Sequence, residues 1–191
     1  MNAMQDFHTS LTDRAILRIL READSAEAFA ATARDRAHLE PWLPFVHRIR
    51  ELDHMRRFIR FRLDQHEKGN GFLAGIFLDG VFVGGAGFHG YDRPPDKTDI
   101  GYWLAPHAQG QGLATLAVAA LVDHAFDAEK LNRVEIRIDV ANSRSRKVPQ
   151  RLGFQLEGIL RQDGFIADRR VDHALYAVLA ADWKSRARRP L

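Results

Sequence analysis

Cysteine is absent from the 191 residues of this sequence. Disulfide bonds, thiolate metal ligands and a cysteine nucleophile are therefore excluded. Long apolar runs are missing too, since none approaches the ~20 residues that span a bilayer. The first ten residues, MNAMQDFHTS, also lack the basic start and apolar core of a secretory signal. We expect a cytoplasmic protein with no membrane partner.

Several catalytic signatures are missing as well. The HExxH pattern of zinc peptidases and the G-x-S-x-G elbow of serine hydrolases do not occur. Metal-ligand spacing is not found among the histidines His89, His107, His124 and His173. We interpret these histidines as structural and predict that the protein binds no metal.

Length and composition favour one globular domain over residues 1–191. The chain is 46% hydrophobic and 28% charged, as is ordinary for globular proteins, and a chain of this length buries well over half of its unfolded surface. Net charge is +3, and the basic tail at 184–191, KSRARRPL, carries four positive charges. A basic tail can bind nucleic acid, but we interpret this one as a flexible, solvated end and predict no specific nucleic-acid partner.

Hydrophobic periodicity and turn residues predict an α+β protein. Strands are expected at 15–20, 72–78, 81–87, 98–104, 134–140, 155–161 and 171–179, and helices at about 24–39, from 51 to near Gly69, at 113–126 and at 143–152. Asp79-Gly80 predicts a two-residue hairpin turn between the second and third strands. Pro41 and Pro44 predict a loop after the first helix.

The order of strand, helix and strand over 98–140 predicts a parallel crossover. In the strand at 134–140 the apolar residues are expected to face inward, and Glu135, Arg137 and Asp139 to face outward. The last two strands are expected to form an antiparallel hairpin.

The most informative segment is AQGQGLAT at 108–115, which follows a strand and opens into an apolar helix. The first turn of such a helix presents unpaired N–H groups, and Gly110 and Gly112 let a phosphate approach the backbone. A P-loop would need a lysine that is absent, and a dinucleotide fingerprint would need glycine at Thr115 and further βαβ units. A pyrophosphate of another carrier is the better interpretation.

Gln109, Gly112 and Ala114 match the Q/R-x-x-G-x-G/A signature with which GNAT acetyltransferases hold acetyl-CoA. Further landmarks occur in the same order, namely WLP at 42–44, DIGYWL at 99–104, NSRS at 142–145, RLGF at 151–154 and GILR at 158–161. The chain thus resembles the GNAT N-acetyltransferases, and their RimJ/RimL-like members in particular. The resemblance implies a GNAT fold with a mixed, mostly antiparallel seven-stranded sheet, splayed between its fourth and fifth strands and flanked by helices.

The same resemblance implies a reaction and its residues. An acetyl group would move from acetyl-CoA to a primary amine by direct attack in a ternary complex, with the N-terminal α-amine of a protein such as a ribosomal protein as acceptor. Acetyl-CoA would contact Trp103, Leu104, Gln109, Gly110, Gln111, Gly112, Leu113, Ala114, Thr115, Asn142 and Ser145. Ser145 would hydrogen-bond the departing sulfur, Trp42 and Tyr176 would contact the acceptor, and a homodimer is one expected assembly.

The general base is less directly implied. Enzymes of the RimL kind carry a glutamate after the E-G-x-L-K/R-Q pattern, whereas this chain has Gly164 in that position. Asp163 and Asp99 are the two remaining candidates. An α-amine is roughly a tenth neutral at pH 7, while a lysine is neutral about once in two thousand, so a weak base favours the α-amine. A small-molecule amine acceptor and a non-catalytic acetyl-CoA-binding module are the alternatives.

Overall fold

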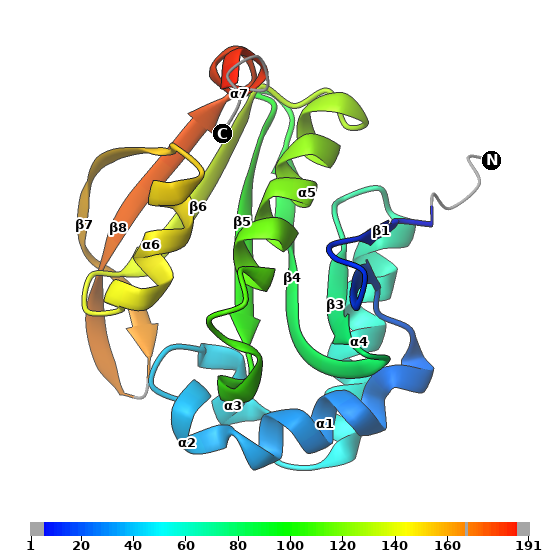
Figure 1. Ribbon diagram of the computed structural model, residues 1–191. Helices are drawn as coiled ribbons and strands as arrows, with labels where there is room; N and C mark the ends of the chain where they lie inside the picture. The colour runs from blue at the N-terminus through cyan, green and yellow to red at the C-terminus, as the bar shows by residue number, and fades with distance from the viewer. Residues whose placement is uncertain (1–5, 167, 187–191) are drawn as a thin grey trace.

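The computed structural model describes residues 6–166 and 168–186, which form one eight-stranded sheet with helices on both faces (Figure 1). The strands are β1 His8–Ser10, β2 Ala15–Ile19, β3 Leu73–Leu78, β4 Val81–Asp92, β5 Lys97–Leu104, β6 Arg133–Asp139, β7 Gln155–Ile166 and β8 Arg169–Leu179. The helices are α1 Ser25–Arg34, α2 Arg36–Leu39, α3 Pro44–Arg48, α4 Leu52–Glu67, α5 Leu113–Asp127, α6 Ser143–Arg151 and α7 Ala180–Arg186. The strand order in the sheet is β1-β2-β3-β4-β5-β6-β8-β7.

All seven predicted strands are present, but the expected count of seven is wrong because β1 adds an eighth. This strand has only three residues, and it pairs antiparallel with β2. The segment predicted as one helix over 24–39 is divided into α1 and α2. The loop predicted around Pro41 and Pro44 also holds a short helix, α3, which Pro44 begins because its fixed φ suits the first helical position.

The sheet opens between β5 and β6. These two strands run parallel, as the crossover predicted, and they pair only from Lys97↔Arg133 to Asp99↔Glu135. Beyond Asp99 they diverge (Figure 1), which leaves the backbone edge of the later half of β5 without a strand partner in the described chain. The expected splay lies between these two strands.

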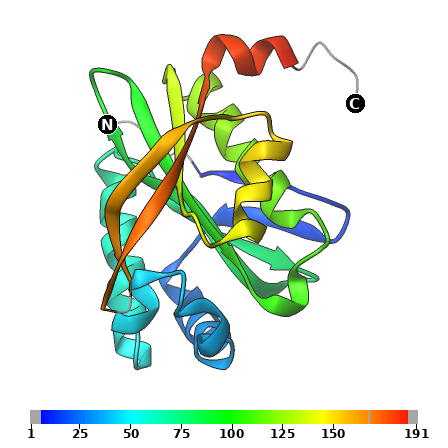
Figure 2. The same ribbon diagram turned by 90° about the vertical axis from the view of Figure 1, so that its left-hand side faces the viewer.

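Two apolar clusters hold the helices to the sheet. On one face α5 packs against the strands through residues such as Leu113, Leu121 and Val118. On the other face α1 and α4 pack through residues such as Ala28 and Ile59. Figure 2 shows α5 and α6 on one side of the sheet and α4 on the other. The alternation of β2 explains both clusters, because its successive side chains point to opposite faces.

The predicted outward face of β6 is partly buried. Glu135 and Asp139 are only 5% and 6% exposed, so the expectation that both face solvent is wrong. Ion pairs account for the burial: Glu135 bonds Arg133 and Arg137, each at 2.7 Å, and Asp139 bonds Arg169 at 2.9 Å. A buried carboxylate is tolerated when cations and hydrogen bonds surround it.

The start of the predicted flexible tail is helical. Residues 184–186 belong to α7, which Trp183 ties to α5 by donating from Nε1 to Asp123 at 2.6 Å. Residues 187–191 of that tail lie outside the described residues. Within the described ranges, no helix combines the length and the apolar character needed to cross a bilayer.

Candidate active site

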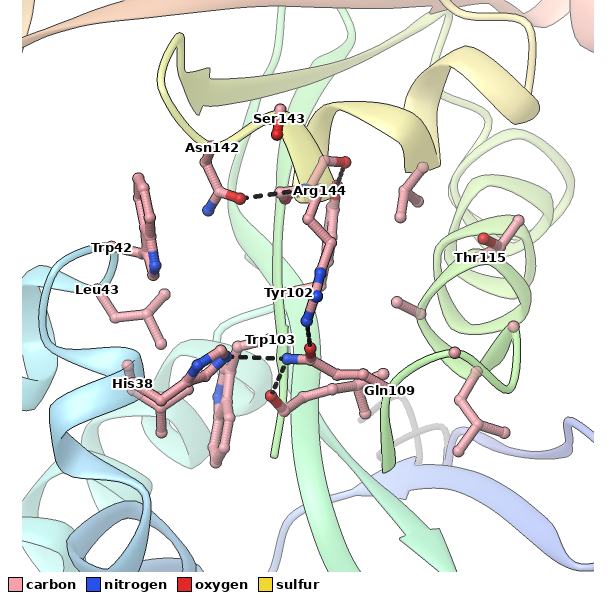
Figure 3. A pocket seen from close by; sticks show the side chains of 18 of the residues that line it. His38, Trp42, Leu43, Tyr102, Trp103, Gln109, Thr115, Asn142, Ser143 and Arg144 are labelled. Atoms are coloured by element: carbon pink, nitrogen blue, oxygen red, sulfur yellow. Dashed lines mark hydrogen bonds between the residues drawn. The ribbon is translucent and has the colours of Figure 1, made fainter. Parts of the chain in front are cut away.

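A cavity of about 510 Å³ lies where the glycine-containing loop meets the end of β5 and the start of α6. We call it the glycine-loop cavity. Figure 3 shows its walls, with Trp42 and Leu43 opposite Arg144 and with Gln109 below. Of the residues predicted to contact acetyl-CoA, its lining includes Trp103, Leu104, Gln109, Gly110, Gly112, Leu113, Ala114, Thr115, Asn142 and Ser145. Gln111, which was predicted with them, does not line it.

The loop leaves room for an anion at the start of α5. Gly110 and Gly112 have φ values of 81° and 78°, a region that favours glycine, and a Cβ on either would meet no atom within 4 Å. The first helical bond runs from the N–H of Leu116 to the carbonyl of Gly112 at 3.0 Å. The N–H groups of the first helical turn are therefore available to a phosphate, and the helix dipole favours its charge.

Gln109 joins the two sides of this cavity. Its Nε2 donates to the carbonyl of Leu104 at 3.1 Å and lies 3.0 Å from Nε2 of His38. Its Oε1 accepts a hydrogen bond from Arg144 on α6, so the guanidinium reaches across the cavity (Figure 3). Gln109 thus fixes the loop to the end of β5 and holds the guanidinium of Arg144 beside that loop.

Two hydroxyl groups meet at the wall between this cavity and its neighbour. Ser145 Oγ donates to the Tyr102 hydroxyl at 3.0 Å, and that hydroxyl donates to the backbone carbonyl of Ser145 at 2.8 Å. Asn142 caps α6 by accepting from the N–H of Ser145 at 3.1 Å. Burial raises the pKa of Tyr102, so its hydroxyl keeps its proton at neutral pH.

A second cavity, of about 680 Å³, lies beyond that wall on the other side of the opened sheet. We call it the histidine cavity because it contains His89 and His173. The two cavities share Trp42, Leu43, Tyr102, Trp103, Asn142 and Ser145 as lining residues. A ligand in one cavity can therefore meet a ligand in the other at the gap between β5 and β6.

Both predicted carboxylates line the histidine cavity, and each is bonded to an imidazole. Nδ1 of His89 lies 2.6 Å from Asp99 Oδ1, and Arg137 donates to Asp99 Oδ2 at 2.9 Å. Nδ1 of His173 lies 3.0 Å from Asp163 Oδ2. The candidate bases are thus two histidine–carboxylate pairs rather than two free carboxylates.

The predicted acceptor residues are placed differently from one another. Trp42 lies in the wall shared by the two cavities. Tyr176 is 1% exposed and lines neither cavity. Its hydroxyl accepts from Arg146 Nε at 3.0 Å and from Gln150 Nε2 at 3.2 Å, because its side of β8 faces α6. The expected substrate contact of Tyr176 is therefore corrected to a core position.

Sequence reasoning did not assign to the site several residues of the two cavities, among them His89, His173, Tyr102 and Arg144. The histidines were interpreted as structural, yet each lies ten positions from its aspartate across an antiparallel pair of strands. The ten-residue spacing of each pair, across the turn that joins two consecutive strands, was the available signal. Among residues 6–166 and 168–186, no cluster of three His, Asp or Glu side chains is placed to hold a metal ion.

Comparison with known proteins decides the family. A sequence profile described as an acetyltransferase (GNAT) domain matches residues 14–155. The chain belongs to the GNAT acetyltransferase family. Its eight-stranded sheet is accordingly a GNAT fold, and the protein is an acetyl-CoA-dependent N-acetyltransferase, as the motifs at 109–114 and 142–154 predicted.

Individual relatives are of the RimJ/RimL type. The GNAT chain is 31% identical over 179 residues to YdaF of Bacillus subtilis (strain 168), named as a candidate ribosomal N-acetyltransferase, and the match covers 93% of this chain and 98% of YdaF. It is 34% identical over 122 residues to the ribosomal-protein-serine acetyltransferase of Escherichia coli (strain K12), covering 64% and 68% of the two chains. The solved structure of Mycobacterium smegmatis RimJ in complex with CoA-disulfide superimposes with a TM-score of 0.81 at 28% identity, covering 91% and 90%.

Proposed function

We propose that this enzyme acetylates the N-terminal α-amine of a protein, with a ribosomal protein as the first candidate, by direct attack of the amine on acetyl-CoA. The observation that carries the proposal is the meeting of two cavities at the opened sheet, one beside an anion-binding loop and the other with paired acids and bases. The names of YdaF and of the Escherichia coli relative support a ribosomal acceptor.

The residues of the glycine-loop cavity fit acetyl-CoA. The loop from Gln109 to Thr115 would hold the pyrophosphate with backbone N–H groups, and Arg144 would add a cation. The unpaired edge of β5 at Trp103 and Leu104 would bond the pantetheine amides, and the amide nitrogen of Asn142 would bond the same arm. Bound there, acetyl-CoA supplies an activated acetyl thioester.

The shared wall would carry out two tasks during transfer. A backbone N–H from the open edge of β5 would stabilise the negative charge that develops on the thioester oxygen. The hydroxyl pair of Ser145 and Tyr102 would donate a proton to the departing sulfur, since both groups line both cavities. Trp42, in the same wall, would contact the first residue of the acceptor.

The histidine cavity also bears on the alternatives. Its carboxylates are already bonded to cations or imidazoles, as Asp139 is to Arg169 and Asp99 to Arg137, so it offers little uncompensated negative charge to a polyamine. The paired histidines and the hydroxyl pair favour turnover over a module that only binds acetyl-CoA.

The test is coenzyme A release from acetyl-CoA with peptides that begin with serine or alanine. Matched controls are the same peptides with a blocked N-terminus and one internal lysine, together with a panel of small amines. We expect turnover on the free N-termini and little on the controls. Acetylation of lysine or of a small amine with free N-termini untouched would overturn the proposed acceptor, and acetyl-CoA binding without any turnover would support the binding module.

A further inference from the structure

His89 extends from β4 into the histidine cavity and is held by a fully bonded carboxylate. Oδ1 of Asp99 lies 2.6 Å from Nδ1 of His89, and Oδ2 accepts a hydrogen bond from Arg137 at 2.9 Å. The Asp99 side chain is 16% exposed, whereas that of His89 is 64% exposed. An ionised carboxylate only accepts, so Nδ1 donates to Asp99, and in a neutral imidazole it is then Nε2 that offers a lone pair to the cavity.

The free nitrogen lies at the opening of the sheet. Gly101 is two residues beyond Asp99, the last residue of β5 that pairs with β6. A Cβ on Gly101 would lie 2.8 Å from Nε2 of His89, so the imidazole lies directly over this glycine. Trp103, in the wall shared by the two cavities, follows two residues later on the same face of β5. The imidazole therefore brings a proton acceptor closer to the shared wall than Asp99 does.

We infer that His89, positioned by Asp99, is the base that removes the proton from the acceptor amine. As the amine nitrogen bonds to the acetyl carbon, Nε2 of His89 accepts one proton from that nitrogen, and Asp99 stabilises the imidazolium. The carbon–sulfur bond breaks with its electron pair on sulfur, which takes a proton from the hydroxyl pair. Water then receives the proton from His89 and restores the one lost by the hydroxyl pair. This inference rests on the proposed function.

The second histidine pair is placed less suitably. His173 lies on β8 opposite Asp139 of β6, and its Nε2 would be 2.7 Å from a Cβ on Gly164, so its imidazole lies over β7 rather than over β5. Its side chain is also less exposed than that of His89, at 18%. Imidazole is the side chain that ordinarily changes charge between pH 5 and 8, so a histidine base gives activity a measurable acid limb.

Several charged or titratable groups line the same cavity as His89 and define the background of such a measurement. They are Arg62 on α4, Asp99 and Tyr102 on β5, Arg137 and Asp139 on β6, Asp163 on β7 and His173 on β8. Burial lowers the pKa of Arg62 to about 10, which still leaves this guanidinium charged at neutral pH. Arg62 also donates to the carbonyl of Phe88, next to His89.

The experiment compares His89→Gln and His89→Gly with His173→Gln and His173→Gly in the full chain. Turnover of acetyl-CoA with the serine-starting and alanine-starting peptides is followed from pH 5.5 to 9. We expect kcat of both His89 variants to fall about 100-fold with KM for acetyl-CoA unchanged, and the melting temperature of His89→Gln to match the wild type. Glycine within a strand lowers stability, so the melting temperature of His89→Gly is compared with that of His173→Gly. In His89→Gln the acid limb of the pH profile should follow the titration of the acceptor amine. Added imidazole should restore turnover in His89→Gly and in none of the other three variants.

Three results would overturn the inference. Turnover of His89→Gln close to that of the wild type would remove His89 from the reaction. A loss with an unchanged pH profile and no rescue by imidazole would assign it a structural role. Loss and rescue at position 173 instead would move the base to the His173–Asp163 pair. In each of these three results the wild-type enzyme still turns over the peptides. If the wild-type enzyme turned over neither peptide, both the proposed acceptor and this inference would be overturned.

Discussion

The two cavities differ in how the chain builds them. The glycine-loop cavity takes its ligand groups from short continuous runs, chiefly 109–115 and 142–145, and offers mainly backbone N–H groups and a helix N-terminus. The histidine cavity is lined by side chains from α4, β4, β5, β6, β7 and β8. Under the proposed function, backbone recognition of acetyl-CoA is local in sequence, while recognition of the acceptor depends on residues that only the fold brings together.

This comparison predicts that substitutions separate by location. A change in the hydroxyl pair of the shared wall should lower kcat, a change in the loop should raise KM for acetyl-CoA, and a change in the core should lower stability alone. A variant that affects all three quantities together would show that the two cavities are not independent.

The largest effect is expected at the shared wall. Ser145→Ala removes the hydroxyl that meets Tyr102 at 3.0 Å but keeps the N–H that Asn142 accepts, so α6 stays capped. We expect kcat to fall about 100-fold because a proton donor to the sulfur is lost, with both KM values nearly unchanged. Steady-state coenzyme A release measures this. Ser185→Ala, an exposed serine of α7 that lines neither cavity, is the control. An unchanged kcat in Ser145→Ala would end the assigned role.

A smaller effect is expected in the loop. Gly112→Ala places a Cβ at a φ of 78°, which costs roughly 1–2 kcal/mol in the left-handed region and turns the first N–H groups of α5 away from the phosphate. We expect KM for acetyl-CoA to rise about fivefold while kcat stays near the wild-type value. The control is Gly158→Ala on β7, since Gly158 has no positive φ and its added Cβ would meet nothing within 4 Å. Equal KM values for acetyl-CoA in the two variants would contradict phosphate binding by the backbone N–H groups of the loop.

Local patterns account for the parts that sequence predicted. Asp79-Gly80 marked the hairpin of β3 and β4, and the order of strand, helix and strand marked the parallel pair of β5 and β6. The loop at 109–115 could be found because glycine content and helix initiation are both local properties. The family resemblance added the opening of the sheet, which no local pattern reports.

The sequence predictions failed where tertiary contacts decide whether a residue is paired or buried. The three-residue strand β1 is too short for periodicity, and Glu135 is buried because Arg133 and Arg137 neutralise it. His89 and His173 each lie on a strand next to a turn, and the aspartate that each contacts is ten residues away on the neighbouring strand. Single residues on a strand give no signal of which cavity they line, so their pairing follows only from strand register.

The smallest effect on activity is expected at Tyr176, where sequence and structure disagree most. Tyr176→Phe removes the acceptor of two hydrogen bonds, from Arg146 at 3.0 Å and Gln150 at 3.2 Å, in a residue that is 1% exposed. Losing such bonds costs about 1–3 kcal/mol of unfolding free energy, and each kcal/mol lowers the melting temperature by roughly 2–4 °C in a chain of this size.

Neither cavity includes Tyr176, so kcat and both KM values of Tyr176→Phe should match the wild type at temperatures where both are folded. Thermal unfolding and steady-state kinetics on the same preparations measure the two quantities. A raised peptide KM with an unchanged melting temperature would return Tyr176 to the acceptor site. The expected opposite result would assign Tyr176 to the core, where its hydroxyl holds α6 against β8, and would exclude it from acceptor recognition.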